Sequence, residues 1–160
     1  MQKQEDIELK WFAARMIRER SYVLKYLDIN GIQHSGIEDL KSLLFIRCPE
    51  ATINTIRYEL YDKVLFYRSA DKKRVEVVPE RTMSTFLLLA PYHDEPVIYL
   101  PVDDPDFFQG PRKRVTTGIF AGCEGIIKRI KGTRRLIIKV SDRAAVATPY
   151  IPQEMLEDIQ

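Results

Sequence analysis

The side chains able to do acid–base, nucleophilic or metal chemistry are few in this chain and lie far apart. The two histidines, His34 and His93, and the two cysteines, Cys48 and Cys123, share no catalytic or metal-ligand spacing. No Walker loop or nucleophile-elbow motif occurs either. Cys48 precedes an expected helix start, but without a histidine beside it we expect a buried, unreactive thiol. We therefore predict that the protein is not an enzyme and binds neither a metal nor another cofactor.

Three aspartates, Asp103, Asp104 and Asp106, lie close together around Pro105. They lack the glycine and the terminal glutamate of a calcium-binding loop. An acidic segment that contains proline suits neither a helix interior nor a central strand, so it predicts a hinge. The sequence thus predicts two domains, residues 1–102 and 111–160, joined by a linker at 103–110.

A glycine-rich stretch marks the second domain. Gly118, Gly122 and Gly125 fall between two runs typical of strands, residues 114–117 and 124–130, and a third such run follows at 136–140. Glycine accepts a positive φ without a Cβ clash, so this spacing predicts a loop that turns tightly over Phe120. We expect Phe120 to plug a small β-barrel.

The first domain alternates between strand and helix patterns. Strands are expected at 8–15, 32–34, 43–47, 63–68, 75–78 and 97–100, and helices at 19–30, from 49 and from 79. The apolar stripes expected on these helices are Val23, Tyr26 and Leu27; Ile53, Ile56 and Leu60; and Met83, Phe86 and Leu87. The strands at 32 and 43 are too close for a parallel crossover. The sequence predicts an α+β protein, in which an α/β sandwich with a mixed or antiparallel sheet precedes an all-β barrel.

The charge is nearly balanced over the whole chain but not along it. The formal net charge is +2 at pH 7; residues 1–105 hold 15 basic and 17 acidic side chains, and residues 106–160 hold 10 and 6. This excess is too small to indicate nucleic-acid binding by itself. No apolar run approaches the roughly 20 residues of a transmembrane helix. Two cysteines without a disulfide pattern favour a soluble protein of the reducing cytoplasm.

The glycine-rich stretch resembles a known motif. Its pattern is similar to the KOW motif of NusG-type transcription factors and of some ribosomal proteins. The matching residues are Val115, Gly118, Phe120, Gly122, Glu124, Gly125 and Ile126. The resemblance implies an SH3-like barrel of the KOW type.

The first domain resembles the NusG N-terminal domain. Trp11 and Phe12 are similar to its Trp-aromatic opening, residues 43–46 fall where that family has an aromatic strand, and Val78, Pro79, Glu80, Met83 and Phe86 resemble its third-helix pattern. With both domains in this order, the resemblance covers nearly the whole chain. It is closest to operon-specific antiterminators of the RfaH kind or the capsule-locus, UpxY kind.

The resemblance implies binding rather than catalysis. Members of the family act in transcription elongation and antitermination: the N-terminal domain binds the clamp helices of RNA polymerase, and the KOW domain recruits Rho or a ribosomal protein. Carried over by position, the polymerase-binding residues are Phe12, Leu43, Phe45, Leu65 and Tyr67, with Asn54 and Thr55 toward the opposite side of the polymerase. Aromatic residues on strands are more often core residues, so only some of these five can be contact residues.

Arg15, Arg18 and Arg20 fall where antiterminators of the family meet the exposed non-template DNA strand. A solvated helix entry explains these arginines equally well. The chain also departs from the family: the arm between the second and third strands is reduced to residues 35–41, and Cys123 replaces an aromatic residue that faces the ribosomal protein. The resemblance implies a monomer.

An RNA-binding KOW protein of translation is the main alternative. Lys128, Arg129, Lys131, Arg134 and Arg135 would then face ribosomal RNA. Ribosomal proteins are usually far more basic than this chain, and the α/β domain would remain unexplained.

Overall fold

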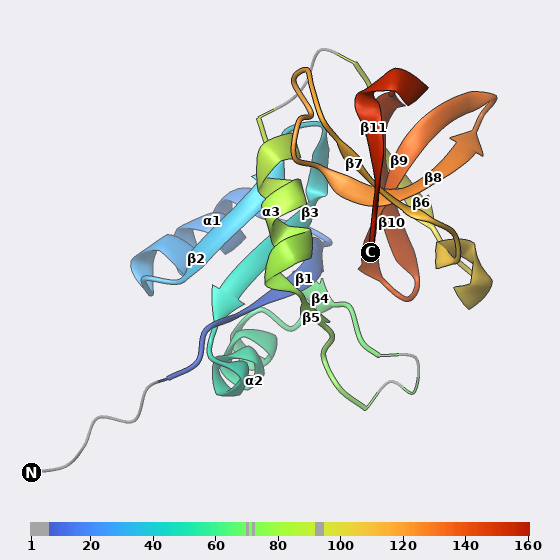
Figure 1. The fold of residues 1–160 in the computed structure, drawn as a ribbon. Helices are drawn as coiled ribbons and strands as arrows, with labels where there is room; N and C mark the ends of the chain where they lie inside the picture. The colour runs from blue at the N-terminus through green and yellow to red at the C-terminus, as the bar shows by residue number, and fades with distance from the viewer. Residues whose placement is uncertain (1–6, 70, 72, 92–94) are drawn as a thin grey trace, which may run out of the picture.

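The computed structural model describes residues 7–69, 71, 73–91 and 95–160. Over these residues it contains three α-helices and two antiparallel sheets, one of five strands and one of six. Figure 1 shows the two sheets as separate layers, with α3 on the side of the first sheet that faces the second. The predicted α+β fold class, with an antiparallel sheet in the first part and an all-β second part, is confirmed.

The first sheet has the strand order β2-β3-β1-β4, and β5 also pairs with β1. Its strands are β1 (Lys10–Met16), β2 (Gln33–Ile37), β3 (Leu40–Cys48), β4 (Val64–Phe66) and β5 (Val77–Val78). Apolar residues occupy both faces of β1 and β3, because each face is covered by other elements. The sheet is thus the middle layer of the first part of the chain.

Helices α1 (Arg20–Ile29) and α2 (Glu50–Glu59) cover one face of this sheet. Gly31 follows α1 with φ of 65°, in the left-handed conformation that ends helices. Pro49 directly precedes α2, where its missing N–H costs no helical hydrogen bond. Ile53, Ile56 and Leu60 are buried as predicted.

Helix α3 (Glu80–Leu89) packs on the opposite face of the sheet. The Phe86 ring stacks on Phe45 of β3, with ring centroids 4.5 Å apart. The predicted stripe was partly wrong: Leu87 is exposed, whereas Thr85 and Leu89 are buried. The reason is that α3 lies between two sheets and buries residues on two sides.

The second sheet has the order β11-β7-β8-β9-β10-β6. Its strands are β6 (Ile98–Pro101), β7 (Arg112–Val115), β8 (Glu124–Ile130), β9 (Thr133–Ser141), β10 (Ala144–Tyr150) and β11 (Leu156–Ile159), with 3₁₀ turns η1 (Pro105–Phe108) and η2 (Gln153–Met155). The strand that the sequence pattern places at the end of the first domain, β6, pairs with β10 of the second sheet. The sequence pattern showed a strand but not its partner.

The glycine-rich loop has the predicted conformation at two of its three glycines. Gly118 and Gly122 have φ of 86° and 95°, and Phe120 between them is buried. Gly125 is different: its φ is not positive, and a Cβ there would collide with the carbonyl oxygen of Ile137 on the paired strand. Glycine is therefore required at position 125 because two backbones approach each other closely there, and not because the chain turns.

One continuous core joins the two sheets. Trp11, Phe45 and Phe86 belong to the same cluster of buried residues as Phe120 and Leu136. The division into domains at 103–110 stays a prediction, with η1 and its two half-buried phenylalanines inside the predicted linker. Among the described residues, no helix is long and apolar enough to cross a bilayer.

Candidate functional site

The apolar patch predicted on the first sheet is mostly interior. Phe12 lies under α1 and α2, while Leu43 and Phe45 lie on the α3 side, and all three are buried. Tyr67 is half-buried, and its hydroxyl hydrogen-bonds to that of Tyr99 at 2.6 Å. Only Leu65, on strand β4, is exposed, with 56% of its surface accessible. A surface for a partner must therefore be built around Leu65 from other residues.

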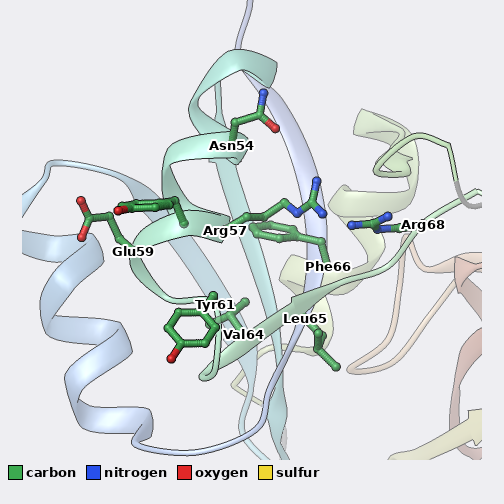
Figure 2. Close-up of a pocket in the computed structure, with 9 residues that line it drawn as sticks. Asn54, Arg57, Glu59, Tyr61, Val64, Leu65, Phe66 and Arg68 are labelled. Carbon is green, nitrogen blue, oxygen red and sulfur yellow. The ribbon is translucent and has the colours of Figure 1, made fainter.

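A groove between α2 and β4 contains Leu65. It has a volume of about 690 Å³ and is lined by Asn54, Arg57, Tyr58, Glu59, Tyr61, Val64, Leu65, Phe66 and Arg68. Figure 2 shows Asn54 at one end of the groove, Tyr61 and Leu65 at the other, and Arg57 with Phe66 between them. We call these nine residues the α2–β4 groove.

Large apolar side chains are unusually exposed in the α2–β4 groove. Tyr58 is 81% accessible and Tyr61 is 75% accessible. Sequence reasoning missed both tyrosines, although helical spacing could have found them. The buried residues of α2 are Ile53 and Ile56, with Leu60 buried at its C-cap, so Tyr58 falls on the solvent side of the helix and Tyr61 directly after its end. Aromatic residues on the solvent side of a helix are candidates for a contact surface.

The charged groups of the groove are arranged around this apolar surface. Arg57 lies in the last turn of α2, where its charge is favourable to the helix dipole, and Glu59 follows two residues later. Arg68 is exposed and lies beyond β4, in an isolated β-bridge with Val75. Tyrosine and arginine are the residue types enriched at protein interfaces, where apolar bodies and charged ends both find partners. The groove therefore suits protein recognition better than catalysis.

The two polar residues predicted at the start of α2 lie on different sides of the helix. Asn54 is exposed and lines the α2–β4 groove. Thr55 is also exposed, but it lines a separate hollow that includes Tyr26 and Pro49. The structure thus brings Asn54, but not Thr55, together with Leu65.

The three predicted nucleic-acid contacts are all exposed. Arg15 lies on β1 directly opposite Leu65 of β4, Arg18 lies between β1 and α1, and Arg20 begins α1. Arg20 lines a hollow beside His34 and Lys41. Their exposure fits either a phosphate contact or a solvated helix entry, so their role stays a prediction.

The nucleophilic and metal-binding side chains form no reactive site among the residues described. Burial raises the pKa of the Cys48 thiol to about 11 and that of the Cys123 thiol to about 12, so both are neutral at pH 7. His34 contacts the carboxylate of Asp28 at 2.7 Å on the surface, and His93 lies outside the described residues. No group of three potential ligands gathers in the described ranges.

The residues of the KOW-like motif described below lie in the core or join two elements of the fold. Val115 and Phe120 are buried in the shared core, and Ile126 lies in a second cluster on the other face of the sheet. The Glu124 carboxylate accepts hydrogen bonds from Arg81 of α3 and, at 2.8 and 3.0 Å, from Arg114 of β7. Burial would raise the pKa of Glu124, but these hydrogen bonds outweigh it and hold the pKa below its usual value. Glu124 thus ties α3 to the second sheet.

Comparison with known proteins gives little beyond this geometry. No model of a known protein family matches the chain. No curated protein matches it. Among solved structures, the chain is similar to one described as the domain interaction in Thermotoga maritima NusG, with a TM-score of 0.49 and 16% sequence identity. That similarity covers 96% of this chain and 98% of the other.

Proposed function

We propose that this protein is a transcription elongation and antitermination factor of the NusG type. It binds RNA polymerase through its first module and a second protein partner through its second sheet. Within that type, we place it with the operon-specific factors of the RfaH or UpxY kind. It acts in the cytoplasm and has no catalytic activity of its own.

Two lines of reasoning support the proposal. The motif resemblance runs along nearly the whole chain, from Trp11 to Ile126. The observation that carries the binding role is the α2–β4 groove, because Tyr58, Tyr61 and Leu65 expose apolar surface that a folded protein otherwise buries. We assign the polymerase contact to this groove rather than to Phe12, Leu43 and Phe45, whose side chains are buried in the core.

A retention experiment with immobilised core RNA polymerase tests the proposal. Wild-type protein is expected to be retained, and Leu65→Glu and Tyr61→Glu are expected to weaken binding by roughly tenfold or more, as for central apolar contacts of an interface. Ile29→Glu is the matched control, since Ile29 is an exposed apolar residue on α1, away from the groove. A Phe45→Glu variant is unsuitable, because a charge at this buried site would unfold the protein.

A parallel sample with 70S ribosomes separates the two classes of function. Retention by polymerase, lost in the groove variants but kept by Ile29→Glu, supports a transcription factor. Retention by ribosomes alone would move the function to translation. Equal retention of all variants by polymerase would place the contact outside the α2–β4 groove.

A further inference from the structure

The hairpin formed by β8 and β9 carries five basic residues whose surroundings differ sharply. The five are Lys128, Arg129, Lys131, Arg134 and Arg135. Two have structural partners within the second sheet. The Lys128 ammonium lies 4.7 Å from the centre of the Phe107 ring, and the Arg135 guanidinium donates to the carbonyl oxygens of Ile130 and Thr148. These two stabilise the fold.

The other three, which we call the tip cations, have no such partner. They are Arg129, Lys131 and Arg134. Within the parts of the chain that the structure describes, none of them forms an ion pair or a side-chain hydrogen bond, while Lys113 on the neighbouring β7 is paired with Asp158. The tip cations are unpaired within that part of the chain, whereas the basic residues next to them already have partners. Their charges are therefore available to an external anion.

The tip cations are also placed where their charges oppose folding. Arg129 and Arg134 are directly opposite each other in the β8–β9 register, so two like charges share one face of the hairpin. Like charges in directly opposed positions destabilise a strand pair. Lys128 and Arg135 are opposed in the same way, but each has a partner within the second sheet that offsets the repulsion. Lys131 begins the turn with φ of 54°, followed by Gly132 at 77°, a position where asparagine or glycine is preferred over lysine. Because these positions lower the stability of the folded protein, the three residues are better explained by a role in binding than by a role in folding.

The shape and chemistry of the tip favour one class of partner. The exposed large apolar side chains among the described residues all lie outside 128–135, so the tip lacks the apolar anchor of a protein interface. One exposed aromatic ring, that of Tyr150 on β10, lies beside the hairpin opposite Arg135, whereas single-stranded nucleic acid stacks successive bases on several rings. Figure 1 shows the β8–β9 hairpin projecting on the side of the molecule away from the first sheet. A projecting two-stranded ribbon fits the major groove of B-form DNA, and cations alone suffice to contact its phosphates.

We infer that the β8–β9 hairpin binds the phosphate backbone of duplex DNA through Arg129, Lys131 and Arg134, without reading the base sequence. This site is separate from the α2–β4 groove and does not depend on the proposed contact with polymerase. Loss of polymerase retention would leave duplex binding intact, and loss of duplex binding would leave polymerase retention intact. The two proposals can thus fail separately.

The salt dependence of binding to a fluorescent DNA duplex measures the number of phosphate contacts. Three contacts predict a log–log slope of about −2.7, so affinity of the full-length protein should fall roughly 40-fold between 50 and 200 mM salt. Arg129→Gln/Arg134→Gln should leave a slope of about −0.9 and a fall of only about 3- to 4-fold. Lys25→Gln/Lys41→Gln, which removes two exposed cations from the first module, is the control and should keep the wild-type slope.

A second variant separates lost binding from lost folding. Arg129→Glu replaces a like-charge pair by an opposite-charge pair with Arg134, so it should raise the melting temperature while it weakens duplex binding. A melting temperature that falls together with affinity would overturn the assignment of a binding role. So would an unchanged salt slope in Arg129→Gln/Arg134→Gln.

The nature of the ligand is tested with three competitors: single-stranded DNA, duplex RNA and poly-glutamate. At equal total charge, each of the three competitors should displace the fluorescent duplex less well than unlabelled duplex DNA does. Stronger binding of poly-glutamate would overturn the inference in favour of an acidic protein segment. Preference for single-stranded DNA or duplex RNA would overturn the assignment to B-form duplex.

Discussion

The hydroxyl of Tyr67 lies 2.6 Å from the hydroxyl of Tyr99, and this hydrogen bond joins the first module to β6 of the second sheet. Both tyrosines are half-buried and packed against the shared core. Burial, together with the hydrogen bond to Tyr99, raises the pKa of Tyr67 above its ordinary value. The Tyr67 hydroxyl thus keeps its proton at physiological pH.

Removing either hydroxyl should destabilise the protein. Tyr67→Phe and Tyr99→Phe are each expected to lower the free energy of unfolding by about 1 kcal/mol, since each leaves one partly buried hydroxyl without its partner. The double variant should cost less than the sum of the two, because it leaves no orphaned group. Urea denaturation of the four proteins measures this coupling, with exposed Tyr150→Phe as control. Strictly additive costs would show that the two hydroxyls do not interact in solution.

Gly125 tests the close approach of β8 and β9. Gly125→Ala should destabilise the protein by roughly 1–3 kcal/mol, because the added methyl group collides with backbone atoms of Ile137. Gly36→Ala is the matched control in a strand: its Cβ would find its nearest neighbour at 3.6 Å, an ordinary contact. Thermal and urea unfolding of both variants give the comparison. Equal stability of the two would mean that the strands are farther apart at Gly125 than the structure shows.

Acid should loosen the contact between α3 and the second sheet through Glu124. Its pKa is lowered in the folded protein, so its ionised form contributes stability above its unfolded pKa of about 4.3. That contribution is lost as the pH falls through the lower folded pKa. Wild-type protein should therefore lose stability below about pH 4 more steeply than Glu124→Gln.

The measurement is the melting temperature between pH 7 and pH 3. Glu154→Gln serves as the control, because Glu154 is exposed on η2 and forms no ion pair among the residues described. It should follow the wild-type curve. Parallel curves for wild type and Glu124→Gln would rule out the depressed pKa of Glu124 as a source of acid sensitivity.

Both thiols should be unreactive in the native state. Burial raises the pKa of Cys48 to about 11 and that of Cys123 to about 12, so at pH 8 the reactive thiolate forms only after unfolding. Ellman's reagent should react slowly with the folded protein and promptly with both cysteines in concentrated urea. A rapid phase in the native protein would reveal a cysteine more accessible than the structure places it.

Sequence patterns alone determined most of the local structure. Periodicity placed the buried residues of α1 and α2, and glycine chemistry at Gly118 and Gly122 predicted the loop over Phe120. These features depend on near neighbours in the chain, so local propensity suffices to predict them. The α+β class followed from the order of the elements for the same reason.

Tertiary structure alone decided which surfaces remain free. The pairing of β6 with β10, the burial of Phe45 beneath Phe86 and the exposure of Leu65 depend on contacts between distant segments. The register of β8 and β9 likewise separated Lys128 and Arg135 from Arg129 and Arg134, although all are basic and close in sequence. An alternating strand pattern assigns residues to two faces, but only the packing of other elements decides which face meets water.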